Sequence, residues 1–158
     1  MINDIQNNLI KKESIFGPDN YKPLPVVLSR AKGVWAWDVN EKKYLDMMSG
    51  YSAVSHGHAH PELLRVFHEQ SSKLSLTSRA FYTDTLGPYL ETITKISGFE
   101  MCLPMNSGAE AVETAIKSSR RWAYRTKKVK PGKAEIIFAE GNFHGRTTTI
   151  ISFSTDEN

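Results

Sequence analysis

The chain has 158 residues, of which 40% are hydrophobic and 23% are charged, and this composition fits one globular domain. Its formal charge of +3 at pH 7 is too small to indicate a nucleic-acid partner. A single cysteine, Cys102, excludes a disulfide within the chain and favours a reducing compartment. No apolar run approaches the length of a membrane span, and residues 1–14 have no hydrophobic signal core. We therefore expect a cytoplasmic protein without a membrane partner.

The N-terminal segment, residues 1–48, is predicted to contain antiparallel strands. Residues 26–28 begin one strand, and two runs of alternating character follow at 34–38 and 43–46. The polar turn between these two runs predicts a hairpin.

A short helix and a loop are predicted before the strands. Residues 4–12 place apolar side chains on one side of a helix, and residues 16–25 form a loop stiffened by Pro23 and Pro25. Tyr21 lies in this loop, where its hydroxyl is either a packed anchor or a ligand contact.

The second predicted domain, residues 49–158, shows helices alternating with short apolar strands. The expected helices cover 61–76, 85–97, 108–126 and a stretch from Thr147, and the expected strands cover 101–105 and 134–139. Crossover helices between strands predict an α/β fold with a parallel sheet. Such a sheet normally has more strands than these, so the sequence is expected to be part of a domain.

Three histidines at alternate positions invite a zinc interpretation. They are His56, His58 and His60. A strand would be needed to bring them together, yet Gly57 and Pro61 break one, and no carboxylate or thiol is expected nearby. A small-residue loop that leads into a helix is the favoured interpretation, and no metal site is assigned.

A strand that ends at Asn106-Ser107-Gly108 and opens a helix has two interpretations. Ser107 is a good N-cap, and Glu110 three residues later would complete a capping box. The same helix end, with its free N–H groups, positive dipole and small residues, would also bind a phosphate. Both interpretations remain open from this stretch alone.

A second unusual turn, Gly141 to Arg146, follows the other predicted strand and offers an aromatic ring and a cation. Because ligands bind at the carboxyl ends of parallel strands, we expect both turns to face one crevice. A flat, conjugated and phosphorylated ligand would suit that pair of turns.

Several motifs together resemble the class III aminotransferases, which are pyridoxal-phosphate enzymes of fold type I, and especially the ornithine branch of that family. The motifs are residues 19–25, Gly50 to Val54, Ser78 to Tyr82, Asn106 to Ala111 and Gly141 to Thr147. The resemblance implies a partial fold of this type, in which the N-terminal hairpin segment precedes the start of the large domain.

The resemblance also implies roles for single residues. Ser107, Gly108 and Ala109 match the phosphate cup of the family, Phe143 matches the aromatic that stacks on the pyridine ring, and His144 is its neighbour. Arg146 matches the arginine that binds a substrate carboxylate, a task that suits the guanidinium fork. Tyr21 and Tyr51 match tyrosines of the ornithine pocket.

The activity implied is transfer of the δ-amino group of L-ornithine to 2-oxoglutarate, giving glutamate 5-semialdehyde and glutamate, in a homodimer. The family's Schiff-base lysine is expected after residue 158, so these residues alone are expected to be inactive and poorly folded. Alternatives are acetylornithine or 4-aminobutyrate as substrate, or a non-enzymatic module that binds a phosphorylated ligand.

Overall fold

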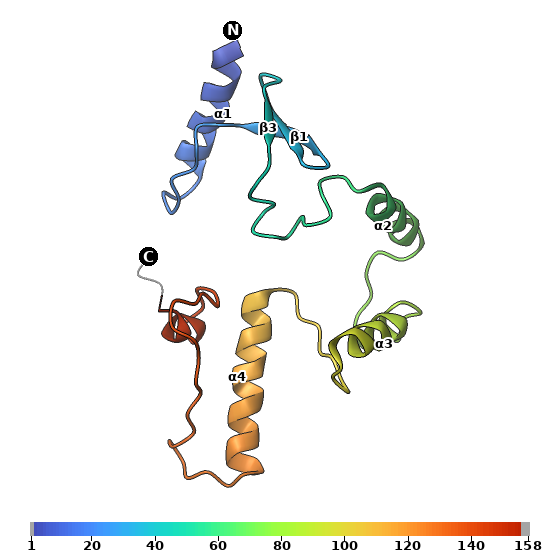
Figure 1. Ribbon diagram of the computed structural model, residues 1–158, viewed down its shortest axis with the longest axis vertical. Coiled ribbons are helices and arrows are strands. Elements are labelled where there is room, and N and C mark those ends of the chain that lie inside the picture. The colour runs from blue at the N-terminus through green and yellow to red at the C-terminus, as the bar shows by residue number, and fades with distance from the viewer. Residues whose placement is uncertain (1, 156–158) are drawn as a thin grey trace. The chain divides into compact units, whose positions relative to one another are not determined.

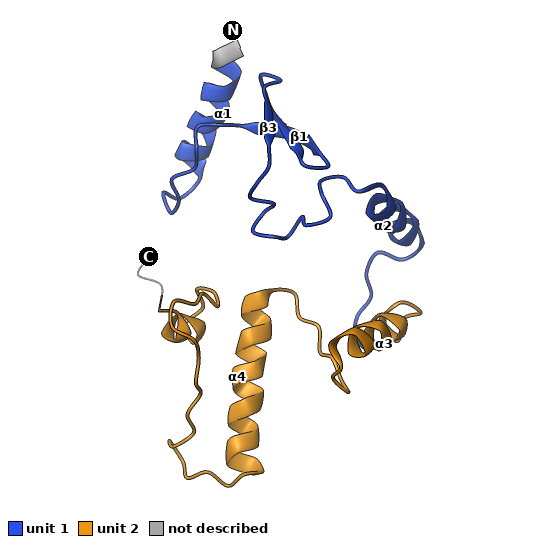
Figure 2. Ribbon diagram, in the orientation of Figure 1, with its two compact units in different colours: residues 1–81 blue, residues 82–158 orange. Residues whose placement is uncertain are grey.

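A computed structural model describes residues 2–155, with side chains from residue 4 onward. The chain divides into two compact units, Met1–Phe81 and Tyr82–Asn158, which Figure 2 shows in different colours. Each unit is described by itself below. The predicted domain boundary after residue 48 stays a prediction.

The first unit contains a three-stranded antiparallel sheet between two helices in chain order (Figure 1). Helix α1, Ile2–Phe16, comes first and α2, Pro61–Lys73, comes last. The strands are β1, Leu28–Lys32, β2, Trp35–Asp38, and β3, Lys43–Leu45, in the order β1-β2-β3. Ala36 pairs with Tyr44 across the β2–β3 hairpin, which confirms the hairpin predicted from the sequence.

The sheet is held by a buried carboxylate and by cations stacked on indole rings. Asp38 is 3% exposed and accepts hydrogen bonds from Tyr44 Oη and from the amides of Asn40 and Lys42. Burial disfavours its charged form, but these hydrogen bonds outweigh burial and lower the pKa of Asp38. Lys43 Nζ lies 3.7 Å from the ring centroid of Trp35. Asp38 therefore ties the turn of the hairpin to strand β3.

The second unit is built on two α-helices and a 3-10 helix. They are α3, Leu86–Ser97, α4, Gly108–Arg125, and η1, Ile150–Phe153. α3 ends at Gly98, whose φ of 74° is the left-handed conformation that glycine adopts without a steric penalty. Ile116 of α4 and Ile150 of η1 are buried. These two side chains mark the core of the unit.

The predicted strands at 101–105 and 134–139 do not form as strands in this structure. A strand requires a hydrogen-bonded neighbour, and no described residue pairs with either segment. The helix expected from Thr147 is the shorter η1. The local apolar pattern can predict an extended or helical segment. It cannot predict the hydrogen bonds to a neighbouring strand that a sheet requires.

The predicted apolar faces of the two short helices are not buried. No residue of α2 or α3 is buried, and Phe67 and Ile96 are largely exposed. Amphipathic patterning predicted the helices correctly, because periodicity depends on the helix itself and not on its partner. Within residues 2–155, each helix is too short or too polar to serve as a membrane span.

Candidate cofactor and substrate site

The start of α4 forms the first part of the candidate site. Ser107 is the N-cap, and its Oγ accepts a hydrogen bond from the amide of Glu110 at 3.2 Å. The N–H groups of Gly108 and Ala109 precede the first helical hydrogen bond and carry the positive end of the helix dipole. A Cβ at Gly108 would meet nothing within 4 Å, so an approaching anion has open space there. The N-cap interpretation is confirmed, and the helix end also stays open to a phosphate.

The turn from Gly141 to Arg146 packs against this helix start. Gly145 has a φ of +125°, and a Cβ built on it would lie 3.2 Å from the Cβ of Ala109. Thr147 Oγ1 donates a hydrogen bond to Glu113 Oε1 at 2.7 Å. The structure therefore brings together two turns that are more than thirty residues apart in the sequence.

Phe143 and Arg146 supply a flat ring and a cation to this turn. The Phe143 side chain is 58% exposed, and the guanidinium carbon of Arg146 lies 5.2 Å from its ring centroid. This distance is within the range of a cation–π contact. An exposed ring beside a cation is suited to a planar, negatively charged ligand.

His144 and Asn142 have buried polar atoms that lack partners among the described residues. These atoms are His144 Nδ1 and Asn142 Oδ1. His144 also lines a cavity of about 280 Å³ together with Ile116, Phe138 and Phe153. A buried polar atom without a partner costs about 1–3 kcal/mol, so a ligand that supplied a partner would be stabilised here. The open helix end, the exposed ring, the cation and these atoms together fit a planar phosphorylated cofactor.

Tyr21 and Tyr51 belong to the first unit. Tyr21 lines a groove of about 640 Å³ between the end of α1 and the proline-rich loop. Tyr51 is 85% exposed and has a φ of 55°. A positive φ at a non-glycine residue is uncommon and is concentrated at functional sites. The structure thus presents both phenols on the surface of their own unit.

The three histidines make two kinds of contact. His58 Nε2 lies 2.7 Å from Asp46 Oδ2, so the expectation that no carboxylate lies near the histidines was wrong. The rings of His56 and His60 meet edge to face with centroids 6.3 Å apart. Across the described part of the chain, no group of three or more His, Cys, Asp and Glu side chains could hold a metal ion.

Glu113 and Thr147 are site residues that sequence analysis missed. Their hydrogen bond fixes the second turn on α4. No spacing rule connects two residues 34 positions apart. The only available signal was that Thr147 follows the predicted ligand residue Arg146 directly.

The family model of class-III aminotransferases matches residues 16–158 of the chain. Among curated relatives, the ornithine aminotransferase of Brevibacillus brevis is 55% identical over 151 residues, which are 96% of this chain and 38% of the relative. The ornithine aminotransferase of Halalkalibacterium halodurans is 53% identical and is covered to 37%. The chain thus spans less than two fifths of the length of these relatives.

Solved structures of aminotransferases are also similar to this chain over part of their length. An ornithine aminotransferase from Toxoplasma gondii aligns with a TM-score of 0.92 at 38% identity, covering 96% of this chain and 35% of that one. An acetylornithine aminotransferase from Elizabethkingia anophelis aligns with a TM-score of 0.82 at 55% identity, covering 96% and 37%. The fold is therefore part of the aminotransferase fold, represented here by the small antiparallel sheet and the helices.

Proposed function

Because the chain belongs to the class-III aminotransferase family, we propose that it forms part of an enzyme that transfers the δ-amino group of L-ornithine to 2-oxoglutarate. The observation that carries the proposal is the packing of Gly145 on Ala109, since it joins the anion-binding helix end to the turn that bears Phe143 and Arg146. The ornithine aminotransferases at 51–55% identity support the choice of substrate.

Pyridoxal phosphate is the proposed cofactor, and when bound it supplies the electron sink for moving an amino group. Ser107, Gly108 and Ala109 would hold its phosphate through the helix N–H groups and the serine hydroxyl. Phe143 would lie against its ring, with His144 beside it. The site then needs no metal ion to neutralise the phosphate, because the helix dipole provides positive potential.

Arg146 is proposed to bind a substrate carboxylate. Its guanidinium offers two parallel N–H donors, which match the two oxygens of a carboxylate. The phenols of Tyr21 and Tyr51 are proposed to accept hydrogen bonds from a substrate amino group. These contacts would orient the substrate so that the δ-amino end, and not the α-amino end, reaches the cofactor.

The remaining catalytic groups, including the lysine that links to the cofactor, are proposed to come from outside these 158 residues. The 158 residues alone would then show no transaminase activity. We also propose a homodimer, which light scattering on the natural protein carrying these residues would test. Cytoplasmic location stays a prediction.

The substrate is tested by Tyr21→Phe in the natural protein that carries these residues, with Tyr89→Phe of α3 as the matched control. We expect kcat/KM for ornithine to fall by about tenfold, the effect of losing one hydrogen bond to a charged group. Acetylornithine has no free α-amino group and should be affected much less. An equal loss for both substrates would refute the ornithine assignment.

The second candidate is acetylornithine as the natural substrate. The observation that favours it is the acetylornithine aminotransferase of Elizabethkingia anophelis. Its sequence is 55% identical to this chain, as is that of the Brevibacillus brevis ornithine aminotransferase. A higher kcat/KM for acetylornithine than for ornithine in the unaltered protein would decide for this candidate.

A further inference from the structure

Basic residues are concentrated at the C-terminal half of α4 and in the loop that follows. Residues 114–134 contain eight of the 20 Lys and Arg residues of the chain and no Asp or Glu. The eight are Lys117, Arg120, Arg121, Arg125, Lys127, Lys128, Lys130 and Lys133. Among residues 2–155, no carboxylate forms an ion pair with any of them.

The charge pattern of α4 differs from that of the other helices. In α2, Arg65 pairs with Glu62 and Glu69, and in α3, Lys95 pairs with Glu91. In α4, the corresponding i,i+4 neighbours Lys117, Arg121 and Arg125 are all cationic. Like charges at this spacing destabilise a helix by about 0.2–0.5 kcal/mol per pair. The helix dipole offsets this repulsion only at Arg125, because its effect is limited to the last turn.

The loop after α4 folds back on the helix and forms an open pocket with it. The amide of Val129 donates to the carbonyl of Ala123, and the amide of Lys133 donates to the carbonyl of Lys130, both at 3.0 Å. Tyr124 is fixed as well, because its Oη accepts a hydrogen bond from the amide of Ala134 at 3.4 Å.

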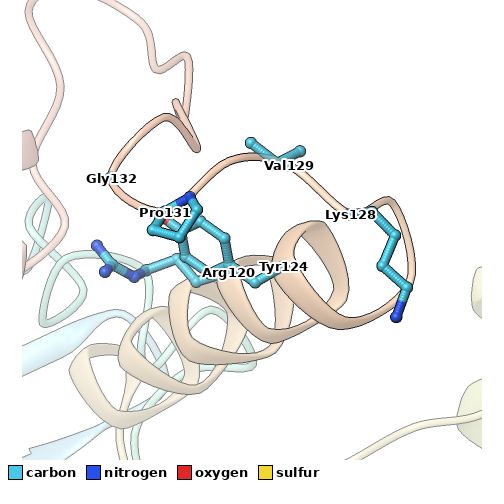
Figure 3. A pocket seen from close by; sticks show the side chains of 6 residues that line it. All are labelled: Arg120, Tyr124, Lys128, Val129, Pro131 and Gly132. Carbon is cyan, nitrogen blue, oxygen red and sulfur yellow. The ribbon is translucent and has the colours of Figure 1, made fainter.

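The resulting open pocket has a volume of about 500 Å³. It is lined by Arg120, Tyr124, Lys128, Val129, Pro131 and Gly132. Figure 3 shows Arg120 and Lys128 on opposite sides, with Tyr124 and Pro131 between them. Arg120 lies 5.9 Å from the Tyr124 ring centroid, and Lys128 has a φ of 56°, which is uncommon outside glycine. The pocket thus combines two separated cations with an apolar floor and no acidic side chain.

We propose that this pocket, which is distinct from the proposed phosphate cup at the other end of α4, binds a small molecule that carries more than one phosphate group. Two cations on opposite sides suit a ligand with two anionic groups better than a single phosphate. The guanidinium of Arg120 can bind one phosphate through two N–H donors, and Lys128 can neutralise the other as a point charge. Binding would also relieve the repulsion among the neighbouring cations.

The test uses the natural protein carrying these residues, loaded with pyridoxal phosphate so that the cofactor site is filled. Calorimetric titration with inorganic triphosphate, ATP and inorganic phosphate would measure the dissociation constants. We expect triphosphate to bind more tightly than phosphate and its affinity to fall as salt is raised. Tighter binding of ATP than of triphosphate would show that a base contacts the Tyr124 side of the pocket.

The decisive variant is Arg120→Gln/Lys128→Gln, and its matched control is Arg121→Gln/Lys130→Gln, which removes the same charge outside the pocket lining. We expect the pocket variant to weaken triphosphate binding by at least about tenfold, since each charge-assisted hydrogen bond contributes about 1.5–3 kcal/mol. The control should weaken it by less than about threefold, as screened charges do. An unchanged melting temperature of both variants without ligand would show that each is folded.

Three results would overturn the proposal. The first is no measurable triphosphate binding to the unaltered protein. The second is an equal loss in both variants, which would indicate diffuse charge attraction instead of a site. The third is tight binding of a short single-stranded RNA together with no triphosphate binding, which would assign the basic surface to nucleic acid.

Discussion

Two carboxylate-bound loops of the first unit and the turn bearing Phe143 in the second unit are fixed in different ways. In the first unit, carboxylates bind partners that are close in sequence: Asp38 accepts from Tyr44, and Asp46 accepts from Ser49 and from His58, twelve residues away. In the second unit, the turn bearing Phe143 and Arg146 is held by the hydrogen bond between Thr147 and Glu113, 34 residues apart, and by the packing of Gly145 on Ala109. The carboxylate contacts hold loops that are local in sequence, whereas the long-range contacts place one segment of the candidate site beside the other.

Gly145→Ala should have the largest effect, because it places a side chain in the long-range contact between Gly145 and Ala109. The new Cβ would lie 3.2 Å from the Ala109 Cβ, and the φ of +125° strains any residue with a side chain. A strained backbone of this kind costs about 1–3 kcal/mol, so we expect cofactor affinity to fall about tenfold or more. Fluorescence titration of the natural protein with pyridoxal phosphate would measure it.

Gly98→Ala is the control for that substitution. Its φ of +74° brings similar strain, but a Cβ there would meet nothing within 4 Å. We expect Gly98→Ala to lower the melting temperature without changing cofactor affinity. If both variants bound the cofactor equally well, the contact between Gly145 and Ala109 would have no role in the site.

Thr147→Val should have a smaller effect, since it removes one hydrogen bond and keeps the shape of the side chain. The net contribution of such a bond is about 0.5–1.5 kcal/mol. Cofactor affinity should therefore fall, or the KM for a carboxylate substrate rise, by a few fold. Thr149→Val is the matched control, because the Thr149 side chain does not cap η1.

Glu113→Gln tests the hydrogen bond between Thr147 and Glu113 from its acceptor side. The amide oxygen can still accept from Thr147 Oγ1, so we expect most of the affinity to be retained. A loss as large in Glu113→Gln as in Thr147→Val would mean that the charge of Glu113, and not its hydrogen bond, matters to the turn.

The difference between short-range and long-range contacts also explains how much of the structure could be predicted from the sequence. The β2–β3 hairpin and the helices α2, α3 and α4 were predicted because alternation, helical periodicity and the Ser107 cap are all local patterns. The segments 101–105 and 134–139 were predicted as strands and are not, because a ladder depends on neighbours that no local pattern shows. The hydrogen bond between Glu113 and Thr147 was missed for the same reason.

The candidate site was predicted from its motifs as two turns that face one crevice. Their order in an α/β pattern suggested one crevice, and the structure brings the turns into contact through Gly145 and Ala109. The roles of Tyr21, Tyr51 and Arg146 came from resemblance, since exposure and backbone strain mark a residue as unusual without naming its ligand.

Asp46→Asn should have the smallest effect, a small loss of melting temperature at neutral pH that disappears in acid. The hydrogen bond with His58 and that from the Ser49 amide lower the pKa of Asp46 below its ordinary value of 3.8. A carboxylate whose folded pKa is lowered adds stability above its unfolded pKa, and this stability is lost as pH falls through the folded pKa. The unaltered protein should therefore lose melting temperature below about pH 4 more steeply than Asp46→Asn.

At neutral pH, Asp46→Asn should lower the melting temperature slightly and leave cofactor affinity the same as in the unaltered protein. This outcome would separate the two kinds of loop anchoring, because loss of the Asp46 carboxylate would change stability and leave the cofactor site intact. If Asp46→Asn instead weakened cofactor binding as much as Thr147→Val does, the hydrogen bond between Asp46 and His58 would also support the cofactor site.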